Sequence, residues 1–272
     1  MRQFLNTARM NGQTVGLVPT MGALHKGHSS LLERSMEENN LTVCSIFVNP
    51  EQFNDPKDLE QYPRDFDKDE EVINNLGPAV IFYPSNDEMY LEKPFVSFDF
   101  GSLDKTMEGE FRQDHFSGVG IVVCKLFNII RPTKAYFGQK DFQQVSIIKK
   151  IVNDLSYETE IVEVPTVREE DGLAFSSRNQ NLTHDQREIA PILFQGLNLA
   201  KSELLNGLEI EQVKQHISQL FHKKWLTLEY FEVVNANNLN SVNDISSAKE
   251  IVLCVAAKIG NVRLIDNLPL FD

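Results

Sequence analysis

Residues 14–28, TVGLVPTMGALHKGH, give the first indication of the fold class. Its first part is a short apolar run that stops at Pro19, which is typical of a buried strand. The turn TMGALHKGH contains Gly22 and Gly27, and the residues that follow, SSLLERSMEEN, have helical spacing. A strand, a glycine-containing turn and a helix in this order indicate an α/β unit.

The alternation of strands and helices continues to about residue 172. LTVCSIFVN, residues 41–49, is apolar on both faces, as expected of a buried parallel strand. A helix that begins near Asp65 ends at Gly77, and a later helix ends before Pro132. The sequence predicts an α/β fold over residues 1–172, a doubly wound, Rossmann-like parallel sheet with helices on both faces. The remaining expected strands are AVIFYP, AYF and TEIVEVP.

The pattern changes over residues 173–272, where a second, smaller α+β domain is expected. Thr183 and Gln186 fit a capping box at the start of a long helix, and Pro191 predicts a kink within it. A further helix is expected from about Glu209 to Lys224. Three strands, near LEYFEVVN, EIVLCVAA and NVRLID, complete this domain.

Composition excludes several classes of protein. The chain has 272 residues, 42% of them hydrophobic, and a formal net charge of −13. The apolar content excludes intrinsic disorder, and the acidic charge disfavours nucleic acid and anionic membranes as partners. No apolar run reaches the roughly 18 residues of a membrane span, and the N-terminus lacks the apolar block of a secretory signal. Cys44, Cys124 and Cys254 lie in apolar stretches without a CxxC pair, which predicts reduced thiols and a cytoplasmic location.

His25 and His28 follow the first strand, at the edge where open α/β sheets bind ligands. The N-terminus of the next helix offers N–H groups and the positive end of the helix dipole, and two imidazole donors there suit a polyphosphate. The alternative is that the histidines only cap the turn. Neither G-x-x-x-x-G-K-[ST] nor G-x-G-x-x-G after a strand occurs, so this H-x-G-H would hold a nucleotide instead. A zinc site is not expected, because no third ligand is near in sequence.

Five blocks of sequence resemble the pantothenate synthetase family of the H-x-G-H nucleotidyltransferase superfamily. They occur in one order from about Val15 to Asn267: VPTMGALHKGH, FVNPEQF with YPR nearby, FGQKDFQQ, VPTVREEDGLAFSSRN and RLIDN. Only H-x-G-H is shared with the wider superfamily. The resemblance implies an ATP-dependent ligase that condenses (R)-pantoate with β-alanine to pantothenate, AMP and pyrophosphate through a pantoyl-adenylate.

The resemblance also implies which residues bind ATP and act on it. His28, His25, Lys140 and Arg178 would be catalytic. The histidines would stabilise charge on the α-phosphate and the departing pyrophosphate, and Lys140 would place a positive charge on a phosphoryl oxygen. The implied ATP-binding residues are Met21, Gly22, Ala23, Leu24, His25, Lys26, Gly27, His28, Gly138, Gln139, Lys140, Asp141, Val167, Phe175, Ser176, Ser177 and Arg178.

For the other substrates, the resemblance implies that Gln52, Gln144 and Asn49 bind pantoate and that Gln52 also binds β-alanine. Amide groups donate and accept hydrogen bonds without a charge that would attack an activated acyl group. Mg²⁺ is expected to accompany ATP, with Asp69 as its protein ligand. A homodimer is implied, and the second domain would act as a lid over the site.

The segment around Arg112 departs from the family pattern. The chain has Arg112-Gln-Asp-His-Phe116 where the family usually has Arg-Pro-Gly-His-Phe, in a loop expected to cover the site from Glu108 to His115. Two other interpretations stay open. Another H-x-G-H adenylyltransferase, acting on a phosphate monoester, would need further basic residues near the site. An inactive nucleotide-binding paralogue would have lost charged catalytic positions, which this chain keeps.

Overall fold

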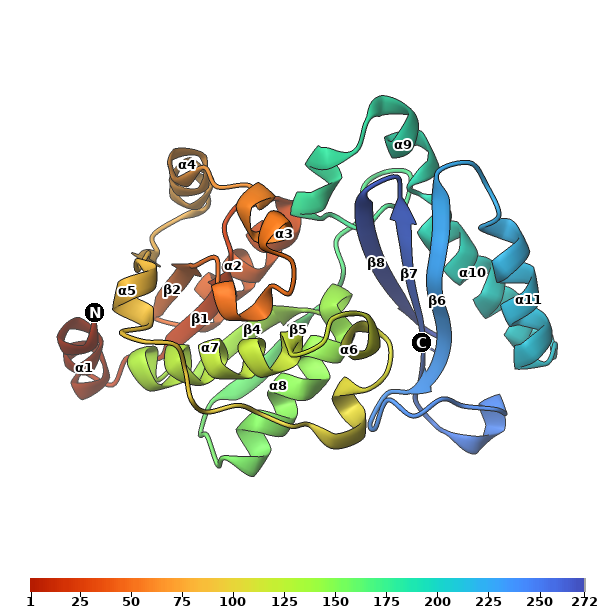
Figure 1. Cartoon of the computed structure of the whole chain (residues 1–272). Coiled ribbons are helices and arrows are strands. Elements are labelled where there is room, and N and C mark those ends of the chain that lie inside the picture. The colour runs from red at the N-terminus through yellow and green to blue at the C-terminus, as the bar shows by residue number, and fades with distance from the viewer. Residues whose placement is uncertain (272) are drawn as a thin grey trace. The chain divides into compact units, whose positions relative to one another are not determined.

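A computed structural model describes residues 1–271. The chain divides into two compact units, whose elements Figure 1 shows. The first comprises Met1–Asp104, Glu108–Gln139 and Gln143–Thr166, and the second comprises Lys105–Met107, Lys140–Phe142 and Val167–Asp272. The expected boundary after residue 172 therefore lies inside the second unit.

The first unit is built on a parallel five-stranded sheet in the order β3-β2-β1-β4-β5. From β1 the chain adds β2 and β3 on one side and then β4 and β5 on the other. The strand order thus reverses between β1 and β4, whose carboxyl ends form the topological switch point at which such sheets bind ligands. The strands are β1 (Val15–Thr20), β2 (Leu41–Ile46), β3 (Val80–Phe82), β4 (Lys134–Gly138) and β5 (Glu160–Val164).

Helices cover both faces of this sheet. One face packs against α1 (Arg2–Met10), α7 (His115–Ile130) and α8 (Phe142–Asp154), and the other against α2 (Lys26–Glu38) and α4 (Phe66–Leu76). Alternate residues of a strand pack into the hydrophobic cores on opposite faces of the sheet. Leu17 faces α7 and Val18 faces α2. The shorter elements are η1 (Pro50–Gln52), α3 (Pro56–Gln61), α5 (Asn86–Met89), η2 (Gly101–Asp104), α6 (Glu108–Phe111) and η3 (Gln139–Asp141).

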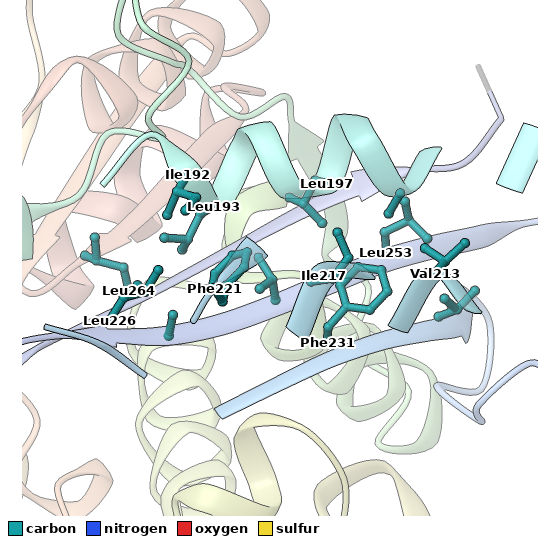
Figure 2. Packing of buried hydrophobic residues seen from close by; sticks show 14 of the residues in the cluster. Ile192, Leu193, Leu197, Val213, Ile217, Phe221, Leu226, Phe231, Leu253 and Leu264 are labelled. Carbon is teal, nitrogen blue, oxygen red and sulfur yellow. The ribbon is translucent and has the colours of Figure 1, made fainter. Parts of the chain in front are cut away.

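The second unit has an antiparallel sheet, β6 (Leu226–Asn235), β7 (Ile251–Ile259) and β8 (Val262–Pro269), in that order. Helices α10 (Ile192–Leu205) and α11 (Ile210–Leu220) cover one face. Figure 2 shows Leu193, Phe221 and Leu253 meeting in the core between these helices and the sheet. The shorter elements are η4 (Ser177–Asn181), α9 (His184–Ile189) and η5 (Ile245–Ser247).

The predicted fold class is confirmed, and several local signals act as expected. Gly77 ends α4 at φ +148°, and the Thr183–Gln186 capping box begins α9. Pro191 separates two helices, α9 and α10, instead of kinking a single one, because proline lacks the N–H that would continue the ladder. Helix α11 ends at Leu220, earlier than expected, since the chain turns there into β6 through Trp225 at φ +65°. None of the helices described combines the length and apolarity that a membrane crossing requires.

Candidate active site

His25 and His28 build the N-terminus of α2. The Nδ1 of His25 accepts a hydrogen bond from the N–H of Gly27 (3.1 Å), and the Nδ1 of His28 accepts one from the N–H of His25 (3.4 Å). The pair therefore forms a reciprocal capping box, with ring centroids 4.0 Å apart. The histidines do cap the turn, as one alternative proposed. This role determines which nitrogen of each ring carries the proton.

A ring nitrogen that accepts a hydrogen bond carries no proton, so a neutral imidazole in this position holds its proton on Nε2. The capping bonds of His25 and His28 thus select the tautomer in which both Nε2 atoms are donors. Two donors beside a helix N-terminus create a site suited to an anion. Capping and anion binding are compatible here, because they use opposite edges of the same rings.

Asp69 holds the loop between β1 and α2 from the first turns of α4. Its Oδ2 accepts from the N–H of Ala23 (3.0 Å) and its Oδ1 accepts from the N–H of Leu24 (2.7 Å). Ala23 has φ +51°, and a Cβ on Gly22 would lie 2.7 Å from the carboxylate. Asp69 is only 3% exposed, and this burial raises its pKa, an effect that the two backbone hydrogen bonds partly offset. The glycine and the carboxylate together determine the shape of the loop.

Asp69, the predicted protein ligand of Mg²⁺, is thus also bound to the loop backbone, and each of its oxygens keeps a second lone pair. Each of its oxygens already accepts a backbone hydrogen bond, and the side chain is almost fully buried. The carboxylate therefore acts on the loop.

Asn49 and Gln52 lie after β2, beside the same loop. The Nδ2 of Asn49 donates to the Oε1 of Gln52 (3.1 Å) and to the carbonyl of Gly118 (3.1 Å), and the Nε2 of Gln52 lies 3.1 Å from the sulfur of Met21. The hydroxyl of Tyr90 donates to the Oδ1 of Asn49 (2.8 Å). These contacts orient the Gln52 amide with its oxygen toward Asn49 and its N–H groups toward the loop.

His115, at the start of α7, and Arg112, three residues before it, contact Gln52. The Nδ1 of His115 lies 2.8 Å from the Gln52 carbonyl, and its Nε2 lies 3.1 Å from the Arg112 guanidinium. His115 is buried, and Arg112 is also 4.0 Å from the Glu108 carboxylate. The sequence alone did not assign a role to His115 or Tyr90. The Arg112–Phe116 block gave a signal for His115, but nothing local marked Tyr90.

The departure from the family pattern coincides with a left-handed backbone. Asp114 has φ +59°, a conformation that glycine adopts without steric cost, and its side chain makes no capping bond to α7. A glycine at this position of the chain would adopt the same conformation without steric cost. The chain tolerates aspartate because Asp and Asn enter this region more easily than other residues.

The other ATP-binding candidates are divided between the units. Gly138 ends β4 and Gln139 begins η3, both in the first unit, next to the end of β1 in the sheet order. Lys140 and Asp141 belong to the second unit, with Nζ and Oδ1 3.6 Å apart. Gln144 lies half-buried in the first turn of α8, in the first unit.

The ATP-binding candidates between residues 167 and 178 lie in two hydrogen-bonded segments of the second unit. The N–H of Phe175 donates to the carbonyl of Val167 (3.1 Å), which pairs the two segments. The hydroxyl of Ser176 accepts from the N–H of Arg178 (3.3 Å) and caps η4, so Ser177 and Arg178 stand in a single short turn. A turn with two hydroxyls and a guanidinium suits phosphate oxygens.

Comparison with known proteins shows the relationship of the chain. A model of the family described as pantoate-beta-alanine ligase matches residues 1–269. The chain belongs to the pantoate-beta-alanine ligase family. It is 46% identical over 268 residues to a pantothenate synthetase of Bacteroides thetaiotaomicron, a match that covers 97% of this chain and 94% of that protein. A pantothenate synthetase of Porphyromonas gingivalis is 44% identical over 276 residues, with 100% and 97% covered.

Solved structures of this ligase family share the fold. Pantothenate synthetase from Thermus thermophilus matches with a TM-score of 0.91 at 37% identity, over 98% of each chain. Pantoate-beta-alanine ligase from Francisella tularensis, complexed with beta-gamma ATP and beta-alanine, matches with a TM-score of 0.80 at 34% identity, over 99% of this chain and 95% of that one. As a member of the pantoate-beta-alanine ligase family, the chain is an enzyme, and the non-enzymatic interpretation is set aside.

Proposed function

We propose that the chain condenses pantoate with β-alanine in two steps, using ATP. A pantoate carboxylate oxygen attacks the α-phosphorus, the bond to the bridging oxygen breaks, and pyrophosphate leaves. The β-alanine amine then attacks the acyl carbon of the adenylate, releasing AMP and forming the amide. The observation that carries the proposal is the loop after β1, where the hydrogen bonding of His25 and His28 fixes two Nε2 donors at a helix N-terminus.

In this proposal the Nε2–H groups of His25 and His28 donate to phosphate oxygens, whose negative charge grows as pyrophosphate departs. Lys140 and Arg178 supply positive charge to the phosphates of ATP. Gly138 to Asp141, Val167 and Phe175 to Arg178 are the further residues proposed to bind ATP. Gln52 and Gln144 bind pantoate, with Asn49 orienting the Gln52 amide, and Gln52 also contacts β-alanine. Mg²⁺ enters as an ion held by the phosphates of ATP.

Two further proposals concern the state of the enzyme in the cell. Within residues 1–271, Cys44, Cys124 and Cys254 form no disulfide, which supports a reducing, cytoplasmic environment. A homodimer rests on family resemblance, and the molecular mass in solution, from light scattering, tests it. A mass near 31.0 kDa would contradict the dimer.

The test of the chemistry is pantoate-dependent exchange of labelled pyrophosphate into ATP without β-alanine. The wild type should show exchange that requires pantoate, and Lys140→Ala should lose it. Lys150→Ala, an exposed lysine on α8, serves as the matched control and should keep it. ATP binding without pantoate-dependent exchange in the wild type would overturn the proposed reaction.

A further inference from the structure

Strand β8 carries two buried polar residues, Asp266 and Asn267, each 4% exposed. They belong to the RLIDN block, to which the proposed reaction assigns no role. Successive residues of a strand point to opposite faces. Asp266 lies in the row of Leu264 and Leu268, which pack into the helix-covered core, so Asn267 faces the other side of the sheet.

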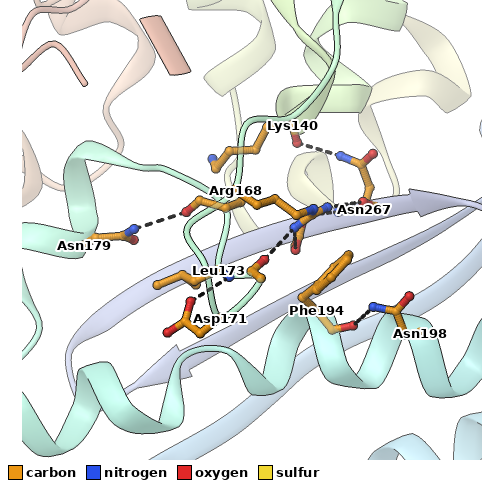
Figure 3. Close-up of polar contacts among 11 residues, drawn as sticks. Lys140, Arg168, Asp171, Leu173, Asn179, Phe194, Asn198 and Asn267 are labelled. Carbon is orange, nitrogen blue, oxygen red and sulfur yellow. Dashed lines mark hydrogen bonds and ion pairs between the residues drawn. The ribbon is translucent and has the colours of Figure 1, made fainter. Parts of the chain in front are cut away.

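On the core side, Asp266 forms a bidentate ion pair with Arg168. The guanidinium donates to both carboxylate oxygens, at 2.6 and 3.0 Å, and to the carbonyl of Gly172 at 3.1 Å. It also lies over the ring of Phe194, 3.9 Å from its centroid (Figure 3). The ion pair therefore fixes β8 against the segment that continues to Phe175 and Ser176–Arg178.

On the opposite side, the Nδ2 of Asn267 donates to the backbone carbonyl of Lys140 (2.8 Å), across 127 residues of sequence (Figure 3). The asparagine is itself held at both ends of its backbone. Its N–H donates to Asp266 Oδ1 (2.8 Å), and its carbonyl accepts from Arg168 (3.2 Å). Residues 140–142 belong to the second unit, although the residues on either side of them belong to the first.

We propose that Asn267 is a positioning residue for adenylate formation, acting through its hydrogen bond to the Lys140 carbonyl. This inference rests on the proposed function, in which Lys140 contacts phosphate. The bond fixes the backbone from which the Lys140 side chain extends. Since the same β8 residues also hold Arg168, one strand determines the placement of two ATP-binding segments, Lys140–Asp141 and residues 167–178.

The fixed backbone matters because a lysine side chain has a flexible four-carbon stem and reaches its target only from a defined starting point. A displacement of about 1 Å at a reacting group can lower a rate by about a hundredfold. Removing the Asn267 amide should therefore lower the rate of adenylate formation without removing any group that touches ATP.

The variant Asn267→Ala tests the inference, with Asn198→Ala as its matched control. Asn198 also donates from Nδ2 to a backbone carbonyl, that of Phe194 at 2.8 Å, but it is exposed on α10 (Figure 3). Pantoate-dependent pyrophosphate–ATP exchange should fall by about tenfold to a hundredfold in Asn267→Ala and stay near wild type in Asn198→Ala.

Repeating Asn267→Ala in the Lys140→Ala background separates positioning from general damage. If Asn267 acts through Lys140, the slow residual adenylation measured in single turnover should change by less than about twofold in that background. An equal loss in both backgrounds would assign Asn267 a structural role and overturn the inference.

Amide hydrogen exchange gives a readout that needs no activity. The peptide that covers residues 138–144 should exchange faster in Asn267→Ala than in the wild type or Asn198→Ala, because the carbonyl anchor is lost. Unchanged exchange in this peptide would overturn the inference even if the enzyme were impaired. A wild type that lacks pyrophosphate exchange would instead refute the proposed function, and the hydrogen-exchange comparison would still decide the role of Asn267.

Discussion

Asp69 accepts a 2.7 Å hydrogen bond from the backbone N–H of Leu24, 45 residues earlier in the chain. The bond joins the beginning of α4 to the loop that carries the two histidines. The second carboxylate oxygen accepts from Ala23, so a single buried side chain satisfies two consecutive N–H groups. The shape of this loop therefore depends on a side chain that has two acceptor oxygens.

Asp69→Asn should displace the loop, because an amide keeps one acceptor and turns an NH₂ group toward the other N–H. We expect adenylate formation to slow by about tenfold or more, and the free energy of unfolding to fall by about 1–3 kcal/mol. If Asp69 acts only through the loop, the concentration of Mg²⁺ that gives half-maximal rate stays unchanged. Asp67→Asn, on an exposed position of the same helix, is the control. A higher Mg²⁺ requirement in Asp69→Asn alone would show that Asp69 is a metal ligand after all.

A substitution at His25 can remove its Nε2 donor and keep its helix-capping hydrogen bond. Asparagine is a favourable N-cap residue, and its side-chain oxygen can accept from Gly27 as Nδ1 does, but it has no group at the position of Nε2. His25→Asn should keep the free energy of unfolding within about 0.5 kcal/mol of wild type. The rate of adenylate formation should fall by about a hundredfold, the usual cost of one donor to a developing charge.

His25→Ala provides the comparison, since it removes the cap as well as the donor. Its stability should fall by about 1 kcal/mol, with a loss of rate similar to that of His25→Asn. Single-turnover adenylation and chemical unfolding measure the two effects separately. If His25→Asn kept the wild-type rate, His25 would be a cap alone.

Substitution of Gln52 should affect the KM for pantoate more than the KM for ATP. The Gln52 amide is oriented by Asn49 and lies beside Met21, so Gln52→Ala removes the proposed pantoate contact and leaves the hydrogen bonds of His25 and His28 in place. We expect the KM for pantoate to rise about tenfold or more, as a lost hydrogen bond to a charged group implies, while the KM for ATP changes little. Initial-rate measurements with each substrate varied in turn provide the test. Equal rises in both values would contradict a role in pantoate binding.

Local signals in the sequence predicted most of the fold. The alternation of apolar strands and amphipathic helices, the glycine after α4 and the capping box at Thr183 all depend on residues within a few positions of one another. The H-x-G-H histidines could be placed at the end of β1 for the same reason. The predicted end of α11, near Lys224, was wrong, because burial of Phe221 and the turn into β6 override the helical propensity of the residues that follow.

The contacts that hold the site could not be predicted, because they join distant segments. Asp69 to Leu24, His115 to Gln52 and Asn267 to Lys140 span 45, 63 and 127 residues. A single hydrogen bond between remote loops leaves no periodic pattern in either one. Resemblance to the family drew attention to the blocks that contain these residues, but their partners appear only in the folded chain.

Asp114→Gly should stabilise the chain. Asp114 has φ +59° and no capping bond to lose, so glycine relieves a steric cost in the folded state without removing a contact. Relief of the steric cost should raise the free energy of unfolding by about 0.5–1 kcal/mol. Part of this gain is offset because glycine has a larger conformational entropy in the unfolded chain. Asp114→Ala keeps the steric cost and should not stabilise. Urea unfolding compares the two variants, and a gain with alanine as large as that with glycine would contradict the conformational explanation.

Arg187 should make stability depend on pH in the acid range. Its guanidinium donates to Asp171 (2.6 Å) and to Glu169 (2.9 Å), in the loop before Phe175, and the bond to Arg187 is the main cause of a lowered pKa at Asp171. A carboxyl with a lower pKa in the folded state stabilises it when ionised. This contribution is complete above the ordinary value near 3.8 and is lost as the pH falls through the lowered folded-state pKa.

Arg187→Ala should therefore lower the free energy of unfolding near pH 7, by at most about 1 kcal/mol because the Asp171 side chain is 42% exposed. The difference from the wild type should shrink as the pH falls below about 4, where both proteins bind the proton. Asp171→Asn should remove most of this pH dependence of the free energy of unfolding. The double variant Asp171→Asn, Arg187→Ala should show no more pH dependence than Asp171→Asn alone. Urea unfolding from about pH 7 to pH 3 measures the difference. A difference that stays constant over this range would mean that Arg187 stabilises the loop by packing and not by its charge.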